Sequence, residues 1–192
     1  MLRTKTVLAL VSLGVLAGLV LTGSGTAWAQ TDDVYWVAYY SGGAQNSRTP
    51  PPVNGAIQIV NPGVNGDICT DIYVFDQFEE LKECCTCFVS ADGLLSLTIF
   101  DVTNNPFTGK FSTTGVIKLL SDPSCSPTNP QPAPEIRAWI NNLNNGTVTE
   151  SEFEPATLSG QELSNLGVQC TAVKNRSGAG ICGNGNPACF FN

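Results

Sequence analysis

Short apolar segments separated by turn residues make up the middle of the chain. Strand-length segments rich in β-branched and aromatic residues lie at 56–63, 68–76, 81–89, 94–101 and 115–121. Turn signals separate them about every ten residues, the spacing of antiparallel sandwiches and barrels. The pattern therefore predicts a mainly β, antiparallel sandwich or barrel-like domain. For 75–83 a single helical turn is the alternative, because Phe75, Phe78 and Leu81 also have helical spacing.

The segment 33–41, "DVYWVAYYS", differs from the other strands because it is apolar on both faces. Alternation places Val34, Trp36, Ala38 and Tyr40 on one face and Tyr35, Val37 and Tyr39 on the other. A strand without a polar face needs cover on both sides. The segment 42–55 that follows, with its Gly-Gly and triple proline, has the composition of a linker.

The second half of the chain predicts a loop, a hairpin and a helix. Five prolines exclude regular structure from 121–134. The segments 135–140 and 147–155 flank Asn145-Gly146, a pair that suits a type I′ turn. Ser159 and Glu162 form a capping box ahead of a helix at about 160–173. One face of this C-terminal helix carries Leu163, Leu166, Cys170 and Val173.

The first 29 residues have the three parts of a secretory signal peptide. Arg3 and Lys5 precede an apolar run at 7–21, and Ala27-Trp28-Ala29 forms the cleavage site. We therefore expect an N-terminal strand and linker at 30–55 and one disulfide-stabilised domain at 56–192, secreted to the extracellular space or the cell surface.

The charge and composition of the chain argue against several classes of function. Without Arg3 and Lys5, seven of the nine basic residues remain against 16 acidic ones, so nucleic acid and anionic membranes are poor partners. The chain has no histidine, which excludes Ser-His-Asp machinery and histidine-ligated zinc. Only carboxylate chemistry, such as glycoside hydrolysis, stays open. We expect no enzyme activity and no cofactor.

An even number of cysteines in an exported chain predicts disulfides rather than a metal site. The eight are Cys69, Cys84, Cys85, Cys87, Cys125, Cys170, Cys182 and Cys189. On the strand 81–89, Cys85 and Cys87 share one face and Cys84 takes the other, so neighbours should not bond each other. We expect Cys69 to bond Cys85 or Cys87. The late cysteines, which are Cys170, Cys182 and Cys189, should pair among themselves and with Cys125.

Three weaker motifs give little indication of a function. The G-x-G-x-x-G match at 178–183 lacks the strand before and the helix after that a phosphate loop needs. The sequons at Asn145 and Asn175 are short patterns. Asp and Glu residues along one hairpin could hold calcium or could be solvated edge charges; they are Asp67, Asp71, Asp76, Glu79, Glu80 and Glu83. Asp71 and Glu83 could also face each other across this hairpin.

Several segments resemble an uncharacterised group of secreted, cysteine-rich bacterial proteins. They are "CTDIYVFD", "ECCTC", "GLLSLTIFD", "GVIK" and "PATLSGQELSNLGVQC…GAGIC", within about 61–182. The resemblance implies export, disulfides and a shared fold, and it implies no catalytic residue. The strand 33–41 and the C-terminal "ACFFN" lie outside it.

Two functions fit these features. The first is a structural or adhesive subunit that could self-assemble into filaments by adding its N-terminal strand to a neighbour's sheet. The alternative for this strand is that it folds back onto its own domain, because sequential strands usually stay together. The residues that would carry this contact are Val34, Tyr35, Trp36, Val37, Tyr39 and Tyr40. The second is a module that binds glycan or calcium through the loops around 101–115 or the hairpin 67–83.

Overall fold

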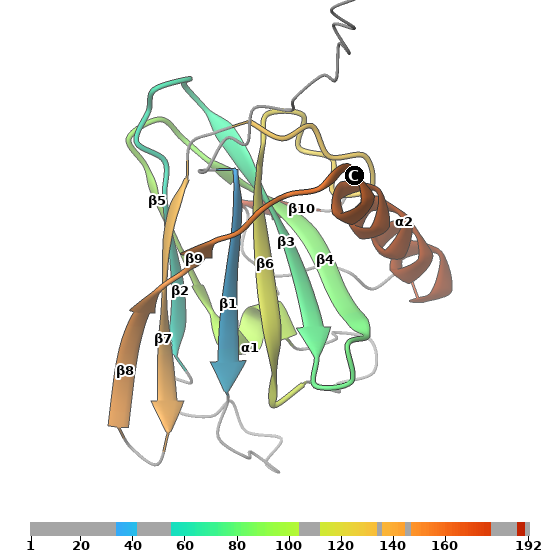
Figure 1. Cartoon of the computed structure of the whole chain (residues 1–192). Coiled ribbons are helices and arrows are strands. Elements are labelled where there is room, and N and C mark those ends of the chain that lie inside the picture. The colour runs from blue at the N-terminus through green and yellow to red at the C-terminus, as the bar shows by residue number, and fades with distance from the viewer. Residues whose placement is uncertain are drawn as a thin grey trace, which may run out of the picture.

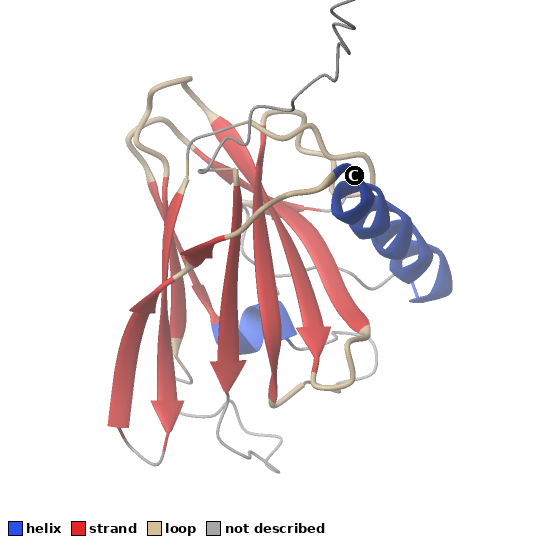
Figure 2. Ribbon diagram, in the orientation of Figure 1, coloured by secondary structure: helices blue, strands red, loops and turns tan. Residues whose placement is uncertain are grey.

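Two antiparallel sheets form the body of the protein. A computed structural model describes residues 34–41, 55–103, 112–133, 136–144, 147–177 and 188–190. The six-stranded sheet has the order β10-β4-β3-β6-β1-β9, and the four-stranded sheet has the order β5-β2-β7-β8 (Figures 1 and 2). The predicted mainly β, disulfide-stapled fold is confirmed, while the signal peptide, most of the linker and the 178–183 motif lie outside the described residues.

The elements follow the sequence closely. The strands are β1 Tyr35–Ser41, β2 Ala56–Val60, β3 Ile68–Asp76, β4 Leu81–Val89, β5 Leu94–Thr98, β6 Thr114–Asp122, β7 Arg137–Asn144, β8 Thr147–Glu152, β9 Glu154–Pro155 and β10 Cys189–Phe190; the helices are α1 Ile99–Thr103 and α2 Gly160–Ser177. Neither helix is both long and apolar enough to cross a membrane, among the residues described.

A tight loop joins β3 to β4, and the helical alternative for 75–83 is wrong. The Asp76 carboxylate accepts hydrogen bonds from the backbone N–H groups of Phe78 (2.9 Å) and Glu80 (3.0 Å). This side chain replaces strand pairing at the turn, as aspartate does in Asx turns. The two strands then pair from Ile68 opposite Val89 to Phe75 opposite Leu81, and the register shifts once, between Val74 and Phe75.

The predicted strand 94–101 ends early, at Thr98. The Thr98 hydroxyl accepts a hydrogen bond from the Asp101 N–H (3.0 Å), and the Asp101 carboxylate accepts one from the Thr98 N–H (3.2 Å). This reciprocal pair is a capping box, and it starts the short helix α1. Ile99 and Val102 of α1 are buried in the core between the sheets.

The predicted hairpin of β7 and β8 is confirmed by their pairing from Trp139 to Asn144, with its turn outside the described residues. The chain then changes sheet at Phe153, whose side chain is fully buried and whose N–H bonds the Ala138 carbonyl (2.9 Å). Beyond it, β9 pairs with β1 in the other sheet. The segment from β8 to β9 thus connects the two sheets along this edge.

Helix α2 covers part of the outer face of the six-stranded sheet (Figure 1). It begins where predicted, because the Ser159 hydroxyl accepts a hydrogen bond from the Glu162 N–H (3.0 Å). The reciprocal half of the capping box is replaced, since the Glu162 carboxylate bonds Lys118 and Tyr35 instead. The cap therefore also ties the helix to the sheet.

Candidate functional site

Strand β1, the predicted assembly strand, lies inside its own six-stranded sheet. All seven of its residues pair with β6, from Tyr35 opposite Leu120 to Ser41 opposite Thr114. Trp36, Ala38 and Tyr40 enter the core between the sheets. Val34 and Tyr35 enter the outer cluster beneath α2. The inner face of the strand is thus covered along its length, whereas cover on the outer face reaches Tyr35 and Val37 and not Tyr39.

The other edge of β1 is only partly paired by backbone. Strand β9 reaches Trp36 and Val37 and no farther. Farther along, the Asn142 side chain of β7 accepts a hydrogen bond from the Ser41 N–H (3.1 Å) and donates one to the Tyr39 carbonyl (3.5 Å). A single amide thereby satisfies two edge groups that a neighbouring strand would otherwise pair. The Tyr39 side chain on the outer face is 60% exposed.

The cysteines staple both faces of the six-stranded sheet. The bonds are Cys69–Cys125, Cys84–Cys170 and Cys87–Cys189, and Cys85 is disulfide-bonded as well. No described cysteine is free. The predicted division of the β4 cysteines between two faces is confirmed. These bonds indicate an oxidising compartment.

The predicted partners of Cys69 and of the late cysteines are wrong. Cys69 bonds Cys125 because it lies opposite Phe88 and points outward, whereas Cys85 and Cys87 point into the core. Cys170 reaches Cys84 beneath the helix, with a Cα–Cα separation of 5.7 Å. Alternation excludes Cys69 as a partner of Cys85 or Cys87 only once the register between β3 and β4 is known.

The hairpin carboxylates do not converge on one site. Asp67 lies at the start of β3 and accepts a hydrogen bond from the Ala91 N–H (2.9 Å). At the far end, Asp76 and Glu80 hold Lys82. Burial raises the pKa of Asp76, but the hydrogen bonds from Glu80, Lys82 and Phe78 outweigh it and the pKa is lowered. No metal-binding group of three such side chains occurs within the described ranges.

Asp71 and Glu83 are fully buried and do not face each other. In the register Asp71 lies opposite Thr86, and Glu83 lies opposite Val74. Val74 points into the core between the sheets, while Tyr73 and its neighbours on alternate positions, Asp71 included, point to the outer face. Neither residue is a solvated edge charge, because both have zero exposure.

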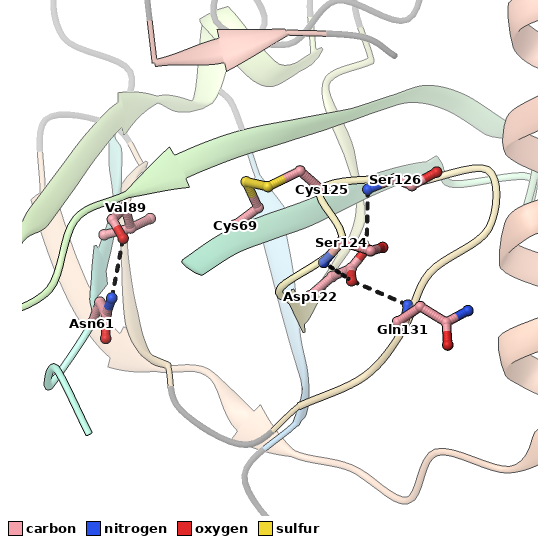
Figure 3. Close-up of a disulfide and its surroundings, with 8 residues drawn as sticks. All are labelled: Asn61, Cys69, Val89, Asp122, Ser124, Cys125, Ser126 and Gln131. Carbon is pink, nitrogen blue, oxygen red and sulfur yellow. Dashed lines mark hydrogen bonds between the residues drawn. A yellow bond between two sulfur atoms is a disulfide. The ribbon is translucent and has the colours of Figure 1, made fainter. Parts of the chain in front are cut away.

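Asp122 at the end of β6 organises the proline-rich loop 123–133 (Figure 3). Its carboxylate accepts hydrogen bonds from the Ser124 N–H (2.7 Å), the Ser124 hydroxyl (2.8 Å), the Ser126 N–H (3.0 Å) and the Gln131 N–H (3.1 Å). The Cys69–Cys125 disulfide and a hydrogen bond from the Tyr73 hydroxyl to the Pro127 carbonyl (2.9 Å) also hold the loop. The sequence indicated a pinned loop and gave no sign of this carboxylate.

A shallow groove of about 390 Å³ lies between this loop and α2. Small residues on the helix let the loop approach, since a Cβ at Gly167 would lie 2.8 Å from the Thr128 carbonyl oxygen. The groove is lined by Thr128, Asn129, Pro130, Gln131, Gly160, Leu163, Ser164, Gly167 and Val168. It mixes amide and hydroxyl groups with apolar side chains and has no charged residue in its lining.

Comparisons with known proteins add little to this geometry. No protein-family model matches the chain, and no curated protein matches it. Among solved structures, the Anabaena sensory rhodopsin transducer is 16% identical, over 69% of this chain and 94% of that chain, with a TM-score of 0.38. A likeness of this size carries no argument about fold or function.

Proposed function

We propose that this protein is a secreted structural or adhesive subunit outside the cell, whose copies assemble by exchanging strand β1. The observation that carries the proposal is the position of β1. It is a central strand that fills a strand-wide slot between β6 and the β7–β9 side. Without it, β6 would become an edge and the core would lose Trp36 and Tyr40. The rest of the domain therefore needs a strand in this slot.

The contacts of β1 are the same whether its own chain or a neighbour supplies it. Such an exchange is domain swapping, and it creates no new interface except at the linker. Whether β1 packs in its own chain or in a neighbour then depends on the protein concentration. A linker of this length keeps β1 near its own slot at an effective concentration on the order of millimolar. Dilute protein should be monomeric, and crowded protein at a cell surface should link.

The disulfides suit this role, because they hold the remaining strands together while β1 is absent. Cys69–Cys125, Cys84–Cys170 and Cys87–Cys189 all join segments C-terminal to β1. Cross-links of this kind restrict the unfolded chain and favour a domain that stays near its folded state.

The exposed edge strand β8 is a poorer candidate for self-assembly. All six of its residues are exposed, and Val148, Glu150 and Glu152 follow one another on one face of the strand. Two copies paired edge to edge would bring like charges together, which is how natural sheets prevent such contacts. The alternative of a glycan- or calcium-binding module stays a prediction, since the hairpin carboxylates are dispersed and 104–111 lies outside the described residues.

A strand-complementation experiment tests the proposal. The chain from 42 onward, with its disulfides formed, should bind a labelled peptide of residues 33–41 with one-to-one stoichiometry. A peptide carrying Trp36→Ser and Tyr40→Ser, which removes the core side chains, is the matched control and should not bind. The full mature protein should give oligomers by light scattering at millimolar concentration and monomers at micromolar concentration.

Two results would reject the exchange of β1. One is a truncated chain that is folded and ignores the peptide. The other is full-length protein that stays monomeric at every concentration, with secreted material that shows no assemblies by electron microscopy.

A further inference from the structure

Asp71 lies in the most unusual environment of the described residues. It is fully buried on the outer face of the six-stranded sheet, opposite Thr86 on β4 and Leu120 on β6. Neither oxygen of its carboxyl group accepts a hydrogen bond from the backbone, and the polar side chains beside it are the Thr86 hydroxyl and the Asp122 carboxyl. A buried carboxylate without backbone donors is strongly unfavourable, so the group must be neutralised.

The neighbouring carboxyl group of Asp122 is also buried, but it has the backbone hydrogen-bond donors that Asp71 lacks. It lies one diagonal step away, because Cys69 pairs with Asp122 while Asp71 pairs with Leu120. Four hydrogen bonds from loop 123–133 occupy both of its oxygen atoms. Two carboxyl groups this close in a dry site do not both ionise, so the one without backbone donors holds the proton.

A cation is a poor substitute for that proton. All the accepting directions of Asp122 are used by loop donors. Asp71 and Thr86 would then offer three oxygen atoms, whereas calcium takes about six to eight. No described lysine or arginine is recorded in contact with Asp71 either, since Lys118 pairs with Glu162 and Lys82 with Asp76 and Glu80.

We propose that Asp71 is a neutral, protonated acid in the folded protein at neutral pH, and that this proton keeps loop 123–133 closed over the sheet. Loss of the proton places a second negative charge directly beside Asp122, the residue that anchors the loop. The groove between the loop and α2 then opens as the pH rises. The folded protein with loop 123–133 closed is therefore favoured at acidic pH.

The charged and titratable groups around Asp71 support this assignment. Burial raises the pKa of Asp71 well above its ordinary value, the charge of Asp122 raises it further, and the Thr86 hydroxyl lowers it only in part. Tyr73 on β3 and Tyr35 on β1 are buried, with pKa values raised above the ordinary range, and stay neutral. Glu162 of α2 is paired with Lys118.

The sign of the pH effect follows from proton linkage. The folded state holds the Asp71 proton, and the unfolded state loses it near the ordinary pKa of about 3.9. Stability from this group is complete below that pH and falls as the pH rises toward the raised pKa of the folded state. Within this window the unfolding equilibrium constant should rise about tenfold for each pH unit.

The test compares the mature, disulfide-intact protein with Asp71→Asn across pH 4 to 9. Asparagine keeps the shape and removes the titration, so the wild type should lose stability relative to the variant by about tenfold per pH unit inside the window. Asp67→Asn is the matched control, because Asp67 is exposed at the start of the same strand and should leave the pH profile unchanged. Amide hydrogen exchange at Ser124, Ser126 and Gln131 should accelerate with pH, beyond the intrinsic rate, in the wild type only.

A second measurement needs no variant. In carbon-labelled wild-type protein, NMR titration should show the Asp71 carboxyl protonated at pH 7. A carboxylate signal at pH 7, or equal pH profiles for wild type and Asp71→Asn, would overturn the proposal. Calcium or sodium that stabilises the wild type and not Asp71→Asn would also overturn it, because a cation would then neutralise the site.

Discussion

The two faces of the six-stranded sheet are held in different ways. The inner face packs Trp36, Ile72 and Ile117 against the second sheet in one large apolar cluster. The outer face carries a smaller cluster beneath α2, with Tyr73 and Leu120 at its centre. The outer face also carries buried polar groups and two disulfides, Cys69–Cys125 and Cys84–Cys170, whereas the Cys87–Cys189 disulfide is set within the apolar cluster of the inner face. Apolar packing therefore dominates the inner face, and the outer face depends more on polar contacts and cross-links.

The largest effect should come from the inner face. Trp36→Ala removes a side chain that is 1% exposed and leaves a cavity in the core. Such substitutions cost about 3–5 kcal/mol of unfolding free energy. The matched control is Tyr35→Phe, one residue away on the outer face, which loses only the hydrogen bond to Glu162 and should cost about 1 kcal/mol. Denaturant unfolding measures both, and equal costs would contradict the contrast between the faces.

A smaller and more local effect should follow removal of the outer disulfide. Replacing Cys84 and Cys170 by serine opens a cross-link between residues 86 positions apart in the sequence. The expected loss is about 2–4 kcal/mol. Because α2 contacts the sheet mainly at β4, hydrogen exchange should accelerate in α2 before it does in β2 or β7. Uniform acceleration in both sheets would show that the outer layer is not a separate unit.

The inner face was the easier one to predict from sequence. Strands β3 and β4 begin and end at the predicted residues because their apolar runs are long and bounded by turn residues. Alternation also places the β4 cysteines correctly. In contrast, strand 94–101 was predicted too long, because the Thr98–Asp101 capping box is a local signal set within an apolar run.

The outer face depended on contacts that the sequence pattern does not encode. The strand pattern places Asp76 at the end of β3, next to the turn, but it does not show that Asp71 is fully buried on the outer face. Loop 123–133, about 50 residues later in the chain, is held to this face by Asp122 and by the Tyr73 hydroxyl, and the pattern of β3 gives no indication of these contacts. Cys125 likewise finds Cys69 only once that loop folds back.

The smallest effect should come from the ion pair that joins α2 to the sheet. Lys118 donates to the Glu162 carboxylate (2.6 Å), and the Tyr35 hydroxyl donates to the same oxygen (2.9 Å). Burial raises the pKa of Glu162, but the hydrogen bonds from Lys118 and Tyr35 outweigh it, so the pKa is lowered. Glu162→Gln keeps the shape and should cost about 0.5–1 kcal/mol at pH 7, since solvent screens the partly exposed pair.

The pH dependence of this pair is opposite in sign to that of Asp71. A lowered pKa in the folded state gives stability that is complete above the ordinary glutamate pKa of about 4.3 and is lost as the pH falls. As the pH rises from acid to neutral, the wild type should therefore gain unfolding free energy relative to Glu162→Gln and lose it relative to Asp71→Asn. If Glu162→Gln keeps its full deficit at pH 3, the pair does not act through charge, and the outer face would be held by packing as the inner face is.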